Sequence, residues 1–124
     1  EGWSGEVMMA KAPLPLEVHE GKFSPNIVIH AENSQNAPLK DYVDFERRSL
    51  GKDDPTYKIL SEKDIGNGTA HRFNSSLSYE KFALRQTVFV YSKNKEFFVI
   101  LATAPAESWS EFESKFDRIL ESFR

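Results

Sequence analysis

The segment Phe97-Phe98-Val99-Ile100-Leu101-Ala102 constrains the fold more than any other part of the chain. Successive side chains of a β-strand point to opposite faces, so a strand with one wet face shows a polar residue at every second position. This segment is apolar throughout. It therefore predicts a strand whose sheet is covered on both faces.

The cover for one face is predicted at the C-terminal end. Large apolar side chains recur there at helical spacing, and charged residues fall outside that stripe: Trp109, Phe112, Phe116, Ile119, Leu120 and Phe123. Pro105 favours a helix start near Ala106, and Ser108 with Glu111 forms a capping-box pattern.

A second helix is predicted from Pro38 to Leu50, with Gly51 ending it. Glu46 lies within the apolar stripe of this helix, where a carboxylate is costly unless it is paired or reaches solvent. Three explanations fit: a site residue, passage of the helix past the sheet edge, or an ion pair with an arginine such as Arg85.

The remaining pattern predicts an antiparallel meander. Segments rich in β-branched and aromatic residues are separated by short turn signals, among them Gly66-Asn67-Gly68 and Ser92-Lys93-Asn94-Lys95. The expected strands are residues 57–65, 69–77, 82–91 and 96–103, preceded by 6–11 and 26–32 with a proline-rich loop at 12–25. The fold class is α+β, an antiparallel meander sheet flanked by helices on both faces.

Composition narrows the function. The 124 residues suit one domain, and 19 acidic against 16 basic side chains give a net charge of −3 with no run of Lys or Arg for nucleic acid. The absence of cysteine excludes disulfides, thiolate metal sites and a cysteine nucleophile. No apolar stretch approaches the roughly 18–20 residues that span a bilayer.

Catalytic and metal-ligating patterns are sparse. Glu17, His19 and Glu20 are the best candidates for ion binding. A durable site needs three or four ligands, and His71 is the residue that could complete this set. His30 and His71 alternate with apolar residues on expected strands, which favours hydrogen-bonded sheet histidines over ligands. We expect no catalytic residue, no metal and no cofactor.

Leu14, Leu16 and Phe23 are the candidate partner-binding residues. They are apolar side chains within a loop expected to be exposed. They either contact a partner or seal one end of the core.

The phrases Leu84-Arg85-Gln86-Thr87-Val88-Phe89-Val90 and Ala102-Thr103-Ala104-Pro105, together with the ending from Phe116 to Phe123, resemble the bacterial DcrB-type domain of the PsbP/Mog-like superfamily. The resemblance is clearest over 82–124 and implies an α/β/α sandwich. Glu1-Gly2-Trp3 resembles the end of the first strand of that family. This implies one DcrB-type domain over residues 1–124 that lacks its first strand or an upstream leader or lipid anchor.

Relatives of that type include envelope lipoproteins, Eag-type chaperones of secreted effectors, Ran-binding Mog proteins and photosystem subunits. The resemblance carries over no catalytic residue. We expect a non-enzymatic accessory domain of the bacterial cell envelope or periplasm that binds a protein or peptide. The alternatives are a cytoplasmic Eag-like chaperone for an apolar segment and, from another class, a metal-dependent hydrolase.

Overall fold

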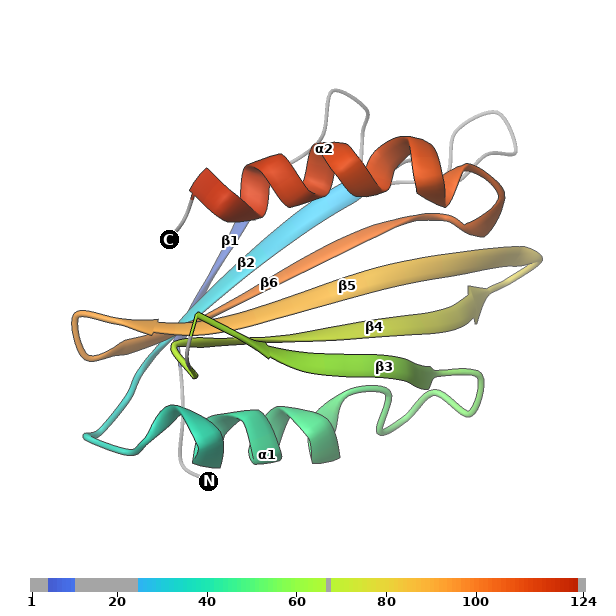
Figure 1. Cartoon of the computed structure of the whole chain (residues 1–124). Helices are drawn as coiled ribbons and strands as arrows, with labels where there is room; N and C mark the ends of the chain where they lie inside the picture. Colours follow the sequence, from blue (N-terminus) through green and yellow to red (C-terminus); the bar gives the residue numbers. More distant parts are fainter. Residues whose placement is uncertain (1–4, 11–24, 67, 123–124) are drawn as a thin grey trace.

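The structure is a computed structural model that describes residues 5–10, 25–66 and 68–122. One antiparallel sheet forms its middle layer, with strands in the order β1-β2-β6-β5-β4-β3. A helix lies on either side of the sheet (Figure 1). The elements are β1 (Gly5–Ala10), β2 (Asn26–Asn33), α1 (Leu39–Ser49), β3 (Lys58–Ile65), β4 (Ala70–Tyr79), β5 (Phe82–Lys93), β6 (Glu96–Pro105), the 3-10 turn η1 (Ala106–Ser108) and α2 (Trp109–Ser122).

The predicted meander from β3 to β6 is confirmed, and so is the α+β sandwich. The turn between β5 and β6 is tighter than expected, because β5 runs to Lys93 and pairs there with Glu96. Asn94 and Lys95 alone make the turn, both with positive φ, which matches the right-handed twist of the strands. The expected turn of four residues is therefore wrong by two residues.

The prediction that both faces of β6 are covered is confirmed. Val99 and Phe97 belong to the core under α1, whereas Ile100 and Ala102 belong to the core under α2. The α1 side draws its buried residues from β4, β5 and β6, and the α2 side draws most of its own from β2, β5 and β6. The two helices therefore cover different parts of the sheet.

The last helix follows Pro105 as predicted, with η1 at Ala106 and regular helix from Trp109. The residue that caps the helical segment is Pro105, which makes no side-chain cap hydrogen bond. Ser108 already lies inside the helical segment, so the predicted capping box is wrong. Neither helix in the described residues has the length and apolar character that a membrane crossing requires.

Candidate functional site

The candidate residues of the loop cannot be placed. Leu14, Leu16 and Phe23 lie outside the described residues, as do Glu17, His19 and Glu20. Their roles therefore stay predictions.

Both described histidines are hydrogen-bonded within the sheet, as predicted. His30 contacts Glu32 on the same strand through Nε2. His71 uses both ring nitrogens, with Nδ1 2.7 Å from Asp64 Oδ1 and Nε2 2.8 Å from Glu62 Oε1. Within the described residues no group of three or more His, Asp or Glu is arranged to hold a metal ion.

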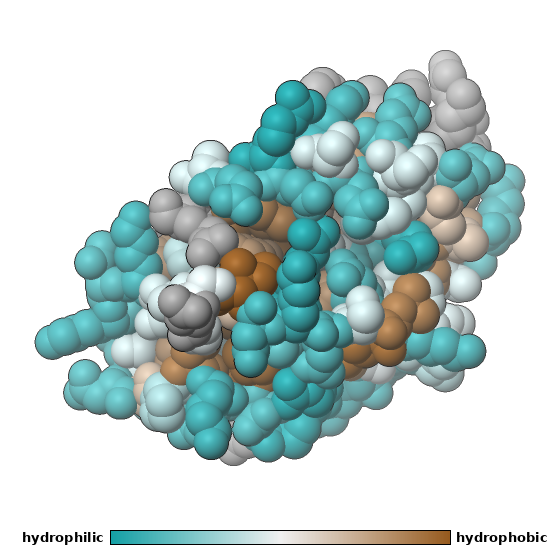
Figure 2. Space-filling model, viewed as in Figure 1, coloured by the Kyte–Doolittle hydropathy of each residue, from teal (hydrophilic) through white to brown (hydrophobic). Residues whose placement is uncertain are grey.

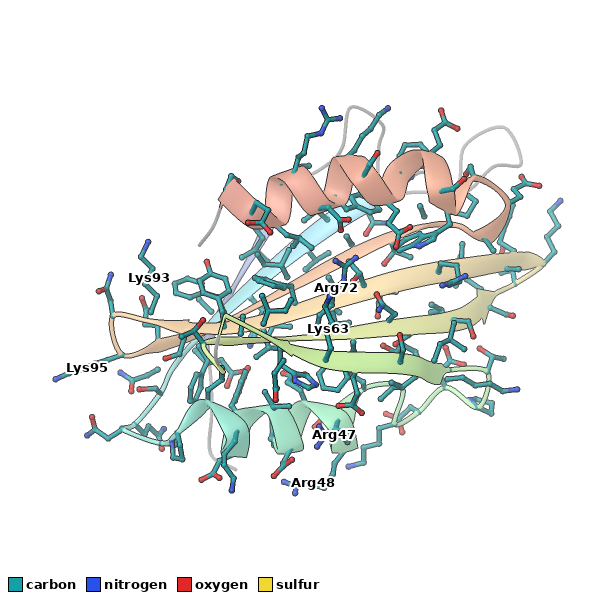
Figure 3. All side chains as sticks on the ribbon, in the orientation of Figure 1. Arg47, Arg48, Lys63, Arg72, Lys93 and Lys95 are labelled. Atoms are coloured by element: carbon teal, nitrogen blue, oxygen red, sulfur yellow. The ribbon has the colours of Figure 1, made fainter. Side chains whose placement is uncertain are left out.

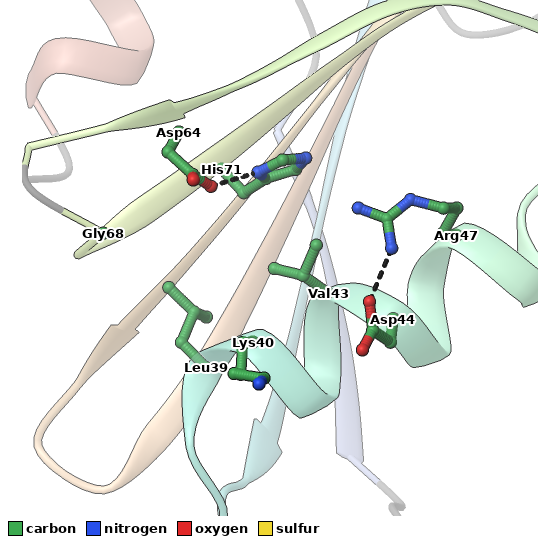
Figure 4. Close-up of a pocket in the computed structure, with 8 residues that line it drawn as sticks. All are labelled: Leu39, Lys40, Val43, Asp44, Arg47, Asp64, Gly68 and His71. Atoms are coloured by element: carbon green, nitrogen blue, oxygen red, sulfur yellow. Dashed lines mark hydrogen bonds and ion pairs between the residues drawn. The ribbon is translucent and has the colours of Figure 1, made fainter.

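Arg47 of α1 completes a charge network beside His71. Its guanidinium donates to Glu62 from Nη2 at 2.6 Å and from Nε at 3.1 Å, and it also donates to Asp44. Arg47 first, and His71 second, hold the pKa of the Glu62 carboxyl below its usual range. The network borders a cavity of about 280 Å³ between α1 and the β3–β4 turn, shown in Figure 4. Each polar side chain of this network has a hydrogen-bond partner within it, so the network stabilises the contact between α1 and the sheet.

Glu46 is buried on the other side of α1. Burial raises the pKa of its carboxyl, while a hydrogen bond with Tyr42 opposes that rise and Glu32 adds to it. The pKa of the Tyr42 hydroxyl is raised in turn by burial and by Glu46 and Glu32. The three side chains, with His30 beside Glu32, form a polar cluster inside the sandwich.

The expected pairing of Glu46 with Arg85 is wrong. Arg85 is an odd-numbered residue of β5 and lies on the α2 side, where its guanidinium is 5.7 Å from the centre of the Trp109 ring. Glu46 belongs to α1, on the opposite side of the sheet. Strand alternation therefore keeps the two charges on opposite faces.

One part of the sheet is not covered by either helix. In Figure 1, α2 lies nearest β1, β2 and β6, while β4 and β3 lie farther from it in the sheet. On the α2 side of β3, β4 and the start of β5, the side chains are polar and either exposed or partly buried. We call this surface the basic face, defined by Lys58, Ser61, Lys63, Arg72, Asn74, Ser76, Ser78 and Arg85.

The charges of the basic face are of one sign. It carries four cations, Lys58, Lys63, Arg72 and Arg85. The acids of the same strand, Glu62 and Asp64, turn to the α1 side, where they bind His71. Alternation along β3 thus sorts acids and bases onto opposite faces of one edge strand.

Side-chain hydrogen bonds hold the middle of the basic face in place. Arg72 donates from Nε to Thr87 Oγ1 at 2.7 Å, and its Nη2 lies 2.9 Å from Asp117 of α2. Asn74 donates to Ser61 Oγ at 3.1 Å. Figure 3 shows Arg72 projecting from the sheet toward α2, with Lys63 on the neighbouring strand.

Two hollows lie on the basic face. One, of about 280 Å³, is bordered by the cations Lys63 and Arg72 and by the acids Asp64, Asp117 and Glu121. The other, of about 480 Å³, lies at the start of η1 and is bordered by Lys58, Ser76, Ser78, Arg85 and Ala106 among others. Guanidinium, ammonium and hydroxyl groups are donors for carboxylates and other anions. The second hollow therefore offers donors to an anionic group, whereas the first carries charges of both signs.

Sequence reasoning missed the basic face, although a signal was present. Arg72, Asn74, Ser76 and Ser78 alternate along β4 and are all polar. This period of two indicates a strand that is wet on one side. What the pattern does not contain is the pairing with β3 and β5, which brings the four cations together.

Comparison with known proteins shows the fold. No protein-family model and no curated protein matches the sequence. Among solved structures, the Pseudomonas aeruginosa protein PA94, of unknown function, superposes with a TM-score of 0.69 at 19% identity over 97% of this chain and 81% of its own. Cyanobacterial PsbP (CyanoP) from Synechocystis gives 0.61 at 12% over 98% and 80%. LpqN of Mycobacterium tuberculosis, involved in cell envelope biogenesis, gives 0.55 at 15% over 94% and 81%.

These likenesses define the class of fold. The chain has the PsbP/Mog-like α/β/α sandwich that its sequence resemblance implies. The finer DcrB-type assignment stays a prediction, since identities below 20% define the fold and no narrower group.

Proposed function

We propose that this chain is a non-enzymatic binding domain that holds an acidic segment of a protein partner on the basic face. The observation that carries the proposal is the part of the α2 side of the sheet that neither described helix covers, where four cations gather in a chain of net charge −3. Complementary charge of this kind orients a partner and speeds its association.

A protein partner suits this surface better than nucleic acid. Nucleic-acid binding commonly uses about 6–10 phosphate contacts. The basic face offers four cations, and Arg72 is already paired with Asp117. Glu62 and Asp64 lie just across the β3 edge and repel a long polyanion. A short acidic segment needs fewer cations than a nucleic acid and does not have to extend past Glu62 and Asp64.

Docking across the face is favoured over addition of a strand to β3. The pairing of β3 with β4 shifts register between Ile59 and Ser61, which marks a bulge. Bulges and charged side chains protect edge strands from pairing with other chains. The partner therefore contacts side chains of the basic face.

The arrangement of the described groups supports a binding role over hydrolysis. Both nitrogens of His71 are engaged by carboxylates, and Glu46 is enclosed with Tyr42. A general base needs a substrate proton within hydrogen-bond reach, and neither group borders the hollows of the basic face.

The exposed apolar surface is too scattered to favour the chaperone alternative. An amphipathic segment binds in a continuous hydrophobic groove. The exposed large apolar residues among those described are Leu60 and Tyr79, each 51% exposed, and Ile119 at 37%. They belong to three elements. Figure 2 shows separate brown patches among hydrophilic residues.

The cell envelope remains the proposed location. Support comes from the likeness to LpqN, whose description names cell envelope biogenesis. Fractionation of source cells with an antibody to the native protein tests it, and we expect the signal in the envelope fraction. Signal confined to the cytoplasm would reject the location without affecting the proposed binding face.

The basic face is tested by partner capture with charge-reversal variants. Lys58→Glu and Lys63→Glu together should abolish capture from source-cell extract, because they turn two attractive charges into repulsive ones. Lys40→Glu is the matched control, since Lys40 is an exposed cation of α1 on the other side of the sheet. Equal loss in the control, or capture by the double variant, would refute the basic face as the contact.

The loop of Leu14, Leu16 and Phe23 is a second proposed contact. Leu14→Asp or Phe23→Asp should weaken capture while the thermal unfolding midpoint stays nearly unchanged. A large drop in that midpoint would instead assign these side chains to the core.

A further inference from the structure

We infer that the hollow at the start of η1 is a carboxylate-binding site, with Arg85 as its principal donor. This inference rests on the proposed function, because it names the group of the acidic partner that the site takes. It concerns one place on the basic face, formed where β3, β4 and β5 meet the N-terminal end of the last helical segment.

Arg85 is the observation that singles out this hollow. Its Nε is buried and has no hydrogen-bond partner among the described residues. No ion pair involving Arg85 occurs in that part of the chain, whereas Arg47 and Arg72 each contact acids. A buried donor without a partner is costly, and it leaves the Arg85 guanidinium with unmet hydrogen-bonding capacity.

The Trp109 ring holds the Arg85 guanidinium in position. The two groups lie 5.7 Å apart, measured from Cζ to the ring centre. Stacking restricts the long side chain, and Nε is buried beside it, so the donors open to a ligand are the terminal Nη groups. A cation that is already ordered loses less entropy when it binds an anion.

The surroundings add positive potential. Lys58 lies at the border of the hollow and adds a second cation. None of the described residues that line the hollow is acidic. Two carboxylates, Asp54 and Glu107, lie one residue from the lining along the chain. Asp54 accepts hydrogen bonds from Thr56 N at 2.8 Å and Thr56 Oγ1 at 2.6 Å.

A carboxylate is the anion that this donor set fits. A guanidinium is planar and pairs with two coplanar oxygens, which matches an Asp or Glu side chain or a chain terminus. The volume of about 480 Å³ admits such a side chain with part of its backbone. The single guanidinium and single ammonium balance one or two negative charges.

The test is a titration of the whole chain with acetate, followed by ¹⁵N NMR. The Arg85 Nε–H and Ala106 N–H signals should shift along a saturable curve, whereas sodium chloride at equal ionic strength should not reproduce that curve. Shifts that sodium chloride reproduces would overturn the inference.

Matched variants assign the effect to Arg85. Arg85→Gln should weaken acetate binding by at least about tenfold, because a hydrogen bond to a charged group is lost. Lys63→Gln, a cation of the same face outside this hollow, should change it by less than about twofold. Acetate affinity retained in Arg85→Gln would overturn the inference.

The partner experiment separates this inference from the proposed function. Capture lost in Arg85→Gln as well as in the Lys58/Lys63 variant supports a partner carboxylate in the hollow. Capture lost only in the Lys58/Lys63 variant would reject the hollow and leave the basic face standing. Acetate binding at Arg85 together with failure of the basic-face test would reject the proposed function and leave a carboxylate site.

Discussion

Gly51 shows how one residue without a side chain permits the connection after α1. Its φ is 69°, and a Cβ at this position would lie 2.3 Å from Tyr57 Cγ. Tyr57 in turn donates from its hydroxyl to Gln86 Oε1 at 2.9 Å. The prediction that Gly51 ends the helix is confirmed, and the Tyr57 contact is a further constraint that only the structure reveals.

Gly51→Ala should therefore destabilise the protein by more than the roughly 1–2 kcal/mol that a left-handed backbone costs an alanine. Gly68→Ala is the control, because its φ is 85° and nothing lies within 4 Å of the added Cβ. Urea unfolding of both variants measures the difference. Equal losses of unfolding free energy in the two variants would show that the Tyr57 side chain moves aside without an energetic cost.

The buried carboxyl of Glu46 should make the unfolding free energy of the protein depend on pH. Burial raises the pKa of its carboxyl in the fold. A group with a raised folded pKa gives its full stabilisation below the unfolded pKa of about 4.3 and loses it as pH rises through the folded pKa. Glu46→Gln, which stays neutral, should gain stability relative to the wild type over that range, by about 1.4 kcal/mol per pKa unit.

Unfolding free energies at pH 3.5 to 8 measure this gain. Tyr42, Glu32 and His30 face Glu46, so the glutamine variant keeps the same neighbours at every pH. A constant difference between the two proteins across the range would show that folding does not shift the pKa of the Glu46 carboxyl.

The partners of Glu46 show where sequence reasoning stops at this scale. The misplaced charge was visible in the stripe of the helix. Its partner Glu32 was not, because Glu32 lies on β2 and meets Glu46 only through the packing of α1 on the sheet. Tyr42 lies four residues before Glu46 on the same helix, so helical spacing does indicate that contact. Arg85 cannot pair with Glu46 because its side chain faces the α2 side of β5. Which side a residue of β5 faces depends on the exact register of that strand.

Among the elements, α2 holds one side of the sandwich together through its buried aromatic side chains. Phe116 is 2% exposed and contacts Trp109, with ring centres 5.7 Å apart. Phe116→Ala should cost about 3–5 kcal/mol of unfolding free energy, because it leaves a cavity beneath the helix.

Ile119→Ala is the matched control on the same helix. Ile119 is 37% exposed, so its truncation should cost less than about 1 kcal/mol. Denaturant unfolding distinguishes the two variants. Similar losses would contradict the orientation of α2 on the sheet.

The elements were largely predictable, and their orientation less so. Alternation and turn residues located the strands to within a few residues, and helical spacing located both helices. The stripe assigned Ile119 to the buried side, which is wrong. Phe116 and Leu120 already fill the space over the sheet, so their neighbour Ile119 turns outward.

At the scale of the whole molecule, covering both faces of β6 was the central sequence prediction, and it is confirmed. The order β1-β2-β6-β5-β4-β3 was not predictable beyond the meander, because it depends on β2 pairing with β6 across a long stretch of chain. That order places β3 and β4 beyond α2, which creates the basic face.

The most direct test of the account is photo-crosslinking from two positions in the native chain. A photoreactive residue replacing Lys63 on the basic face, and another replacing Asp41 on α1, report what lies against each side of the sheet. The account predicts that the captured partner crosslinks from position 63, through an acidic segment, and does not crosslink from position 41. Crosslinking from position 41 alone would contradict it.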